Sequence, residues 1–198
     1  MGEQESMAKL AAETLQNRER ALYWAEQVAI VVGASLFVAL CAKVTLPLPF
    51  TPVPLAMENF GVLLVGLALG SRRGFAALLL FLMEGAMGMP VFAQAGIGGI
   101  AQIIGPTGGF LIAYPFVAWL AGWIMERGRK TFARAAVAAL LAECVLFAGG
   151  IGWLFVLTHS ISMALRFGLY WFVFAEIIKV LMSSAIVSGW RRMRKAQS

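Results

Sequence analysis

The sequence has little charge, a single histidine and no aspartate. Charged residues make up 13% of its 198 residues, against about 25% in a soluble domain, and this excludes a soluble protein. His159 has no aspartate or second histidine with which to complete a catalytic triad or a metal site. The two cysteines, Cys41 and Cys144, fall in different hydrophobic runs, so a disulfide framework is not expected.

Long hydrophobic runs fill most of the chain, which is 61% hydrophobic with a mean hydropathy of +0.83. About 20 helical residues cross a bilayer of ~30 Å. Runs of that length cover residues 27–49, 52–70, 74–125, 135–158 and 167–190. Pro90 and the segments GIGG and GPTGG divide the third run into 74–88 and 110–126. The sequence therefore predicts an all-α integral membrane protein with six transmembrane helices.

Three segments follow from this pattern. Residues 1–25 form a polar segment, which is either an amphipathic helix on the membrane surface or disordered. Residues 26–192 form the six-helix domain, in which a ligand would bind. Residues 193–198 form a basic tail.

Lysine and arginine lie mostly on one side of the predicted topology. With six spans, both termini share a side with the basic segments 70–74 and 127–134. The loops expected on the opposite side are 45–57, 89–109 and 157–166. These loops carry only Arg166, with Lys43 close by. The positive-inside rule predicts cytoplasmic termini in a multi-pass protein of the cell membrane. The asymmetry also accounts for the net charge of +6 without nucleic-acid binding.

Two loops on the predicted outer side have unusual compositions. TLPLPFTPVPLAMENF (45–60) is rich in proline, so it is expected to be extended until after Pro54. GMPVFAQAGIGGIAQIIGPTGGF (88–110) is rich in glycine and nearly uncharged. A loop of this kind is tolerated at membrane depth only where protein covers it or where it lines a cavity. The two loops together predict a lid over a pocket that opens to the outside.

Ionisable residues within the hydrophobic runs mark the candidate site, because a charge at the bilayer centre costs about 2.5–3.5 kcal/mol on insertion scales. Glu176 and Lys179 are three residues apart and therefore share a helix face. They form either a ligand site or a structural ion pair. Glu58 is expected either to favour its helix N-terminus or to face the pocket. For Glu84 one interpretation is that it faces the same pocket, and for Glu143 one interpretation is that it is packed, but the sequence leaves both roles open.

Several motifs resemble the BioY family, the biotin-binding S components of energy-coupling factor (ECF) transporters. They are PLPFTPVPLAMENFGVLLVGLALGSRRG, MGMPVF and GPTGGFLIAYPFVAWLAG, and the resemblance covers residues 45–190. It implies the six-helix S-component fold, with biotin held near the outer surface by the first, third and fifth loops and the last helix. It also implies no cofactor, and as partners a coupling membrane protein and a pair of ABC-type ATPases.

The resemblance also suggests which residues bind. AEIIK (175–179) is similar to the family's Gly-Asp-x-x-Lys element, which places Glu176 and Lys179 in the biotin site. Ala175 stands where glycine is usual, Phe174 where proline is usual, and Glu58 where glutamine is common. The ureido group would meet Glu176 and Lys179, and the thiophane ring would lie against Phe92 and Trp171. The remaining candidates, for the tail carboxylate, are Gln94, Gln102, Arg166 and the backbone around Gly96, Gly98 and Gly99.

A stripe of small residues on the first span is the candidate docking surface for the coupling protein. Ala25, Ala29 and Gly33 recur every four residues, which allows another helix to approach closely. The alternatives are that this stripe packs internally, or that Ser35 and Ala39 form the docking face. Two other functions stay open: an S component for another vitamin or a biotin relative, and an intramembrane enzyme that uses glutamate and His159.

Overall fold

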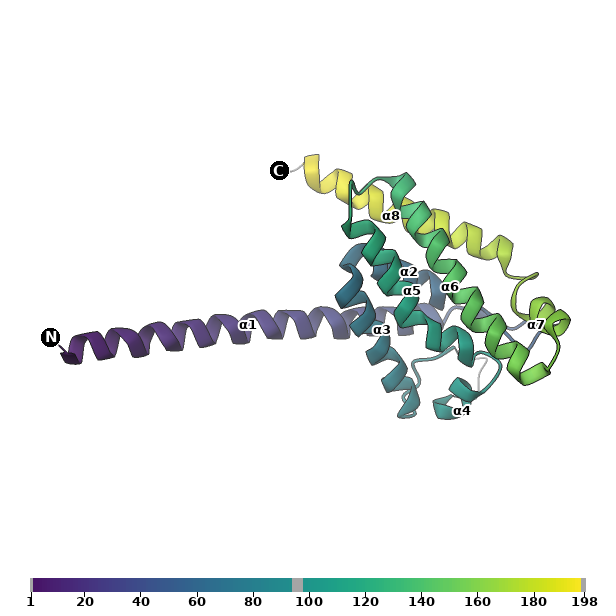
Figure 1. Ribbon diagram of the computed structural model, residues 1–198, viewed down its shortest axis with the longest axis horizontal. Coiled ribbons are helices and arrows are strands. Elements are labelled where there is room, and N and C mark those ends of the chain that lie inside the picture. The colour runs from purple at the N-terminus through teal and green to yellow at the C-terminus, as the bar shows by residue number, and fades with distance from the viewer. Residues whose placement is uncertain (1, 94–97, 197–198) are drawn as a thin grey trace.

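The computed structural model describes residues 2–93 and 98–196. The helices are α1 (Gly2–Ala42), α2 (Glu58–Leu69), α3 (Ser71–Ala86), α4 (Gly99–Ile104), α5 (Gly108–Glu126), α6 (Phe132–Thr158), α7 (Ile161–Gly168) and α8 (Val173–Ala196). Two short strands, β1 (Thr45–Leu46) and β2 (Leu55–Ala56), pair antiparallel. Both ends of the described chain lie away from α4 and α7, which sit at the opposite end of the molecule (Figure 1).

Four helical segments are long and apolar enough to cross a membrane, among the residues that the structure describes. They are Glu13–Ala42, Gly108–Glu126, Phe132–Thr158 and Val173–Trp190. The second and third predicted spans coincide with α2 and α3, which have 12 and 16 residues and are shorter than expected. The structure therefore shows a membrane protein with four candidate spans among its described residues, and the number of six transmembrane helices stays a prediction.

Gly70 explains why α2 and α3 are separate helices. Its φ of 89° ends α2, and this conformation favours glycine. The Glu126 carboxylate accepts hydrogen bonds from the backbone N–H and the hydroxyl of Ser71, both at 2.8 Å. The end of α5 thereby satisfies a backbone N–H at the start of α3 that has no partner within its own helix.

The predicted boundary at residue 25 does not interrupt the helix. α1 runs unbroken from Gly2 to Ala42 and projects from the bundle in Figure 1. Between residues 13 and 29 the side chains are exposed, apart from the half-buried Gln27. The polar segment and the first predicted span are therefore one continuous helix.

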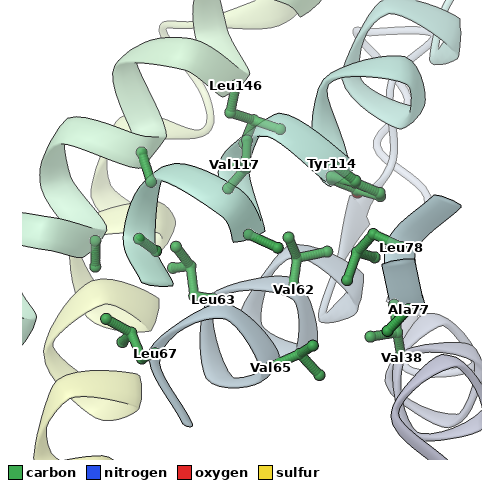
Figure 2. Packing of buried hydrophobic residues seen from close by; sticks show 14 of the residues in the cluster. Val38, Val62, Leu63, Val65, Leu67, Ala77, Leu78, Tyr114, Val117 and Leu146 are labelled. Carbon is green, nitrogen blue, oxygen red and sulfur yellow. The ribbon is translucent and has the colours of Figure 1, made fainter. Parts of the chain in front are cut away.

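Many large apolar side chains on the long helices are exposed. Leu40 is 70% exposed, and Phe116, Phe155 and Ile177 are also exposed. In a soluble protein these residues would be a liability, but in a bilayer they face lipid. The interior holds a continuous apolar cluster that includes α2 side chains such as Val62 and Leu63 (Figure 2).

Small residues let the helices approach closely. A Cβ atom added at Gly66 of α2 would lie 2.6 Å from the carbonyl oxygen of Ala118 in α5. On the other side of α5, Gly109 packs against Gly149 and Trp153 of α6. Helix pairs in membranes associate through such contacts, because lipid removes the hydrophobic driving force between them. α5 therefore occupies the centre of the bundle, between α2 and α6 (Figure 1).

The three loops on the predicted outer side are more structured than expected. β1 and β2 hold the ends of the proline-rich segment together, and α2 begins at Glu58, after Pro54 as predicted. The short helices α4 and α7 occupy the second and third loops. The last long helix, α8, begins at Val173 rather than at residue 167, because α7 continues to Gly168.

Candidate functional site

A cavity lies between the proline-rich loop and helices α2, α5, α6 and α8. It contains about 540 Å³ of space between atoms, part of which is open to solvent. Its wall consists of Val53, Pro54, Ala56, Glu58, Asn59, Ala93, Gln102, Thr107, Phe110, Leu111, Tyr114, Leu146, Phe147, Phe172, Glu176 and Lys179. The cavity thus combines an apolar wall with a small set of polar side chains.

Glu176 and Lys179 form a buried ion pair in this wall. Lys179 Nζ lies 2.6 Å from Glu176 Oε1, and the side chains of Lys179 and Glu176 are 5% and 8% exposed, respectively. Lys179 Nζ also donates to the carbonyl oxygen of Ala56 in β2, at 2.7 Å. The pair therefore shares one face of α8, as the spacing predicts, and anchors the proline-rich loop to that helix.

Asn59 joins three helices, and sequence analysis missed it. Its Nδ2 atom donates to Glu143 Oε1 of α6 at 2.6 Å and to Glu176 Oε2 of α8 at 2.7 Å. Asn59 is only 4% exposed. The available signal was a second polar side chain beside Glu58 in the first turn of a helix whose other residues are apolar, since polar residues in such helices usually have a function.

Glu58 lies in the cavity wall at the first position of α2. The Tyr114 hydroxyl donates to Glu58 Oε2 at 3.3 Å, and both side chains are buried. Among the residues that the structure describes, no side-chain hydrogen bond caps the N-terminus of α2. Of the two alternatives for Glu58, the structure therefore favours the one in which its carboxyl group faces the pocket.

Some buried polar atoms of the site have no hydrogen-bond partner among the described residues. In the wall these are Glu58 Oε1 and Asn59 Oδ1, and behind it Glu143 Oε2. An ammonium group has three N–H donors, and Lys179 uses two of them. The site thus presents two buried acceptors and a cation with a further hydrogen to donate. Because a buried unpaired polar group costs about 1–3 kcal/mol, a complementary ligand would be stabilised here.

The aromatic wall differs from the sequence prediction. Trp171 is 48% exposed and packs against Phe50, with the ring centroids 4.3 Å apart, outside the cavity wall. The neighbouring Phe172 lines the cavity together with Phe110 and Phe147. Trp171 and Phe172 both lie in the turn before α8, which begins at Val173, and of the two only Phe172 is among the described residues of the wall.

Phe92 is also not part of the cavity wall. It is buried against Phe81, with the ring centroids 5.3 Å apart. A Cβ atom at Gly85 would overlap its ring, so the absence of a side chain there makes room for Phe92. Phe92 therefore holds the loop after α3 against the bundle.

The residues predicted for the tail carboxylate are dispersed. Gln102 lines the cavity and is 3% exposed, but its Oε1 accepts the N–H of Gly98 at 3.1 Å, which shapes the start of α4. Gly98 has a φ of 72° and is not in the wall. Arg166 is exposed on α7 and is not among the described residues of the wall. Gln94 and Gly96 lie outside the described residues.

Glu84 faces α1 and is not among the described residues of the cavity wall, which goes against the interpretation that it faces the pocket. Its Oε2 accepts the Ser35 hydroxyl at 2.5 Å, and both residues are buried between α1 and α3. Glu143 is buried, which agrees with the interpretation that it is packed. The two acidic residues differ because Glu84 lies on the α1 side of α3, a rotation that the sequence alone does not reveal.

Lys43 fastens the loop after α3 to the end of α1. Its Nζ donates to the carbonyl oxygen of Pro90, and to that of Phe92 at 3.4 Å. Ala93, at the end of the same described stretch, lines the cavity. The lysine thus restrains a loop that borders the candidate site.

The sequence matches the BioY family over residues 8–196. It is 36% identical over 157 residues to a probable biotin transporter BioY of Pyrococcus horikoshii, covering 78% of this chain and 90% of that protein. It is 34% identical to the biotin transporter BioY2 of Lactococcus lactis, covering 77% and 82% respectively. For a biotin transporter BioY of Thermotoga maritima, the identity is 31%, over 82% of this chain and 96% of that one.

The fold is similar to a solved structure. That crystal structure is of an S-component for biotin from an ECF-type ABC transporter, and the TM-score is 0.78. The match covers 86% of this chain and 93% of the other, with 24% sequence identity. At this identity the likeness establishes the fold alone.

Proposed function

Because the chain belongs to the BioY family, as its loop motifs indicate, we propose that it captures biotin in the cell membrane as the S component of an ECF-type transporter. It is a transport protein, not an enzyme. The proposal rests on the polar side chains that line the cavity. Its two acceptors without partners and its ammonium group complement a ureido ring, which has two N–H donors and one carbonyl acceptor.

In this arrangement the ureido N–H groups donate to Glu58 Oε1 and Asn59 Oδ1, and the ureido carbonyl accepts from Lys179. Glu176 contributes indirectly, because its two oxygens already hold Lys179 and Asn59 in place. This refines the sequence prediction, in which Glu176 itself was the acceptor. The thiophane ring packs against the apolar wall formed by Phe110, Phe147 and Phe172.

The tail carboxylate requires N–H donors on the outer side of the cavity. The proposed donors are Gln102, which lines the wall, and Gln94, Gly98 and Arg166 in the neighbouring loops. The Gly-rich loop supports this assignment, because Gly98 and Gly99 have positive φ and so present backbone groups in a conformation that other residues rarely adopt.

We further propose six membrane spans with cytoplasmic termini, and ABC-type ATPases with a coupling membrane protein as partners. The fold similarity supports this membrane architecture. The docking stripe is supported by exposure: Ala25, Ala29 and Gly33 are exposed, and a Cβ atom at Gly33 would meet nothing within 4 Å. Ser35 and Ala39, the alternative docking face, are buried, and this favours the stripe of Ala25, Ala29 and Gly33.

The purified protein tests the proposal directly. Mass spectrometry of the co-purified small molecules is expected to find biotin, and calorimetry is expected to show one site per chain. Dethiobiotin keeps the ureido ring, so comparing its Kd with that of biotin in calorimetry shows whether the ligand is biotin or a biotin relative. The proposal fails if neither compound binds and a different vitamin co-purifies.

Removal of the lysine that restrains the loop is expected to speed ligand release. In Lys43→Met, the carbonyl groups of Pro90 and Phe92 lose their donor, so the loop beside the cavity opens more often. Net contributions of hydrogen bonds to charged groups are about 1.5–3 kcal/mol when buried, and less here because Lys43 is only half-buried. We expect biotin to dissociate several-fold faster, and the amides of residues 88–93 to exchange hydrogen faster. Unchanged dissociation and exchange would show that Lys43 does not restrain the loop.

A further inference from the structure

Glu143 is a buried acidic residue that the proposed contacts with biotin do not use. It belongs to α6, is 4% exposed, and is not among the described residues of the cavity wall. Its Oε1 accepts a hydrogen bond from Asn59 Nδ2 at 2.6 Å. An acidic residue in an apolar membrane helix is disfavoured unless it has a partner or a purpose. Here the partner is a residue of the cavity wall.

The two acidic residues beside Asn59 determine which end of its amide faces them. Only the NH₂ group can donate to Glu143 and Glu176 together, and it has one hydrogen for each. The opposite orientation would set the amide oxygen against two carboxylate oxygens. The χ2 torsion of asparagine is broad, so its amide orientation depends on such neighbours. With the nitrogen engaged on both sides, Oδ1 is the atom left for a ligand, and it has no partner among the described residues.

We propose that Glu143 is a positioning residue for biotin: by holding one N–H of the Asn59 amide, it keeps Oδ1 available as the acceptor for a ureido N–H. The inference rests on the proposed function. Glu176 alone leaves the second N–H of Asn59 without a partner, so the amide can rotate toward other acceptors. Glu143 therefore acts on ligand selectivity from behind the wall, without touching the ligand.

Three variants in full-length protein test the role. Glu143→Met removes the acceptor and keeps a long side chain, whereas Glu143→Gln keeps an oxygen that can accept from Asn59. Glu84→Met is the matched control, because Glu84 is likewise a buried membrane carboxyl group that accepts one hydrogen bond, from Ser35. Each protein is titrated with biotin and with an analogue in which one ureido N–H is replaced by oxygen, for each of the two ring positions.

The expected result is a loss of affinity together with a loss of discrimination. Glu143→Met should bind biotin roughly tenfold more weakly, as expected for one net hydrogen bond, and should discriminate less against one of the two analogues than the parent does. Glu143→Gln and Glu84→Met should keep the parent's affinity and discrimination.

The outcomes separate the inference from the proposed function. Parent-like binding by Glu143→Met, or an equal loss of affinity for biotin and both analogues, would overturn the positioning role. If Glu143→Met does not fold, Glu143→Gln decides. Loss of discrimination in Glu143→Gln would overturn the positioning role, and parent-like discrimination would support it. Failure of the parent protein to bind biotin would overturn the proposed function, and the inference with it.

Discussion

Glu176→Ala and Lys179→Ala are each expected to abolish high-affinity biotin binding. Lys179 is the cation of the cavity wall, and Glu176 holds both Lys179 and Asn59 in place. Loss of a buried hydrogen bond to a charged group costs about 1.5–3 kcal/mol, or roughly 10- to 150-fold in Kd. Either substitution also leaves the other charge buried without its partner, so the measured loss should lie at the upper end of this range or beyond it.

A double variant separates ligand binding from structural pairing. Glu176→Gln/Lys179→Met removes both charges at once and so avoids an isolated buried charge. Folded protein that fails to bind biotin in calorimetry would identify a ligand site. If the double variant binds like the parent, Glu176 and Lys179 are a structural ion pair that orients α8 and the proline-rich loop.

Ala29→Trp is expected to leave biotin binding intact and to block ATP-dependent uptake when the partner subunits are co-expressed. Ala29 is exposed in the middle of a stripe of small residues on α1, far along the chain from the residues of the cavity wall. An indole there would prevent another helix from approaching closely. Because the side chain points away from the bundle, the isolated protein should fold and bind normally.

Val28→Trp is the matched control. Val28 is 59% exposed on the same helix but points in a different direction, so a tryptophan there should leave uptake unchanged. Normal uptake by Ala29→Trp would place docking on another surface. Unfolding of the isolated Ala29→Trp protein would instead show that the stripe packs internally, in conflict with its exposure.

The sequence by itself determined the features that depend on neighbouring residues. Hydrophobic runs of about 20 residues identified a membrane protein, because the bilayer requires that length of helix. The spacing of Glu176 and Lys179 placed them on one helix face, because helical geometry relates residues three apart wherever the helix lies. Pro54 excluded a helix before α2, because proline lacks the N–H that a helix interior needs. The loop motifs identified the family because each motif is a short run of neighbouring residues.

Only the tertiary structure decided which distant side chains meet. Asn59 lies 84 residues from Glu143 and 117 from Glu176, and no local pattern relates them. The rotation of α3 turned Glu84 toward Ser35, and the turn before α8 put Phe172, and not Trp171, in the cavity wall. Such partners depend on how each helix is rotated and how deeply it sits against the others. Close packing at small residues sets those two quantities, and hydrophobicity along the chain carries almost no information about them.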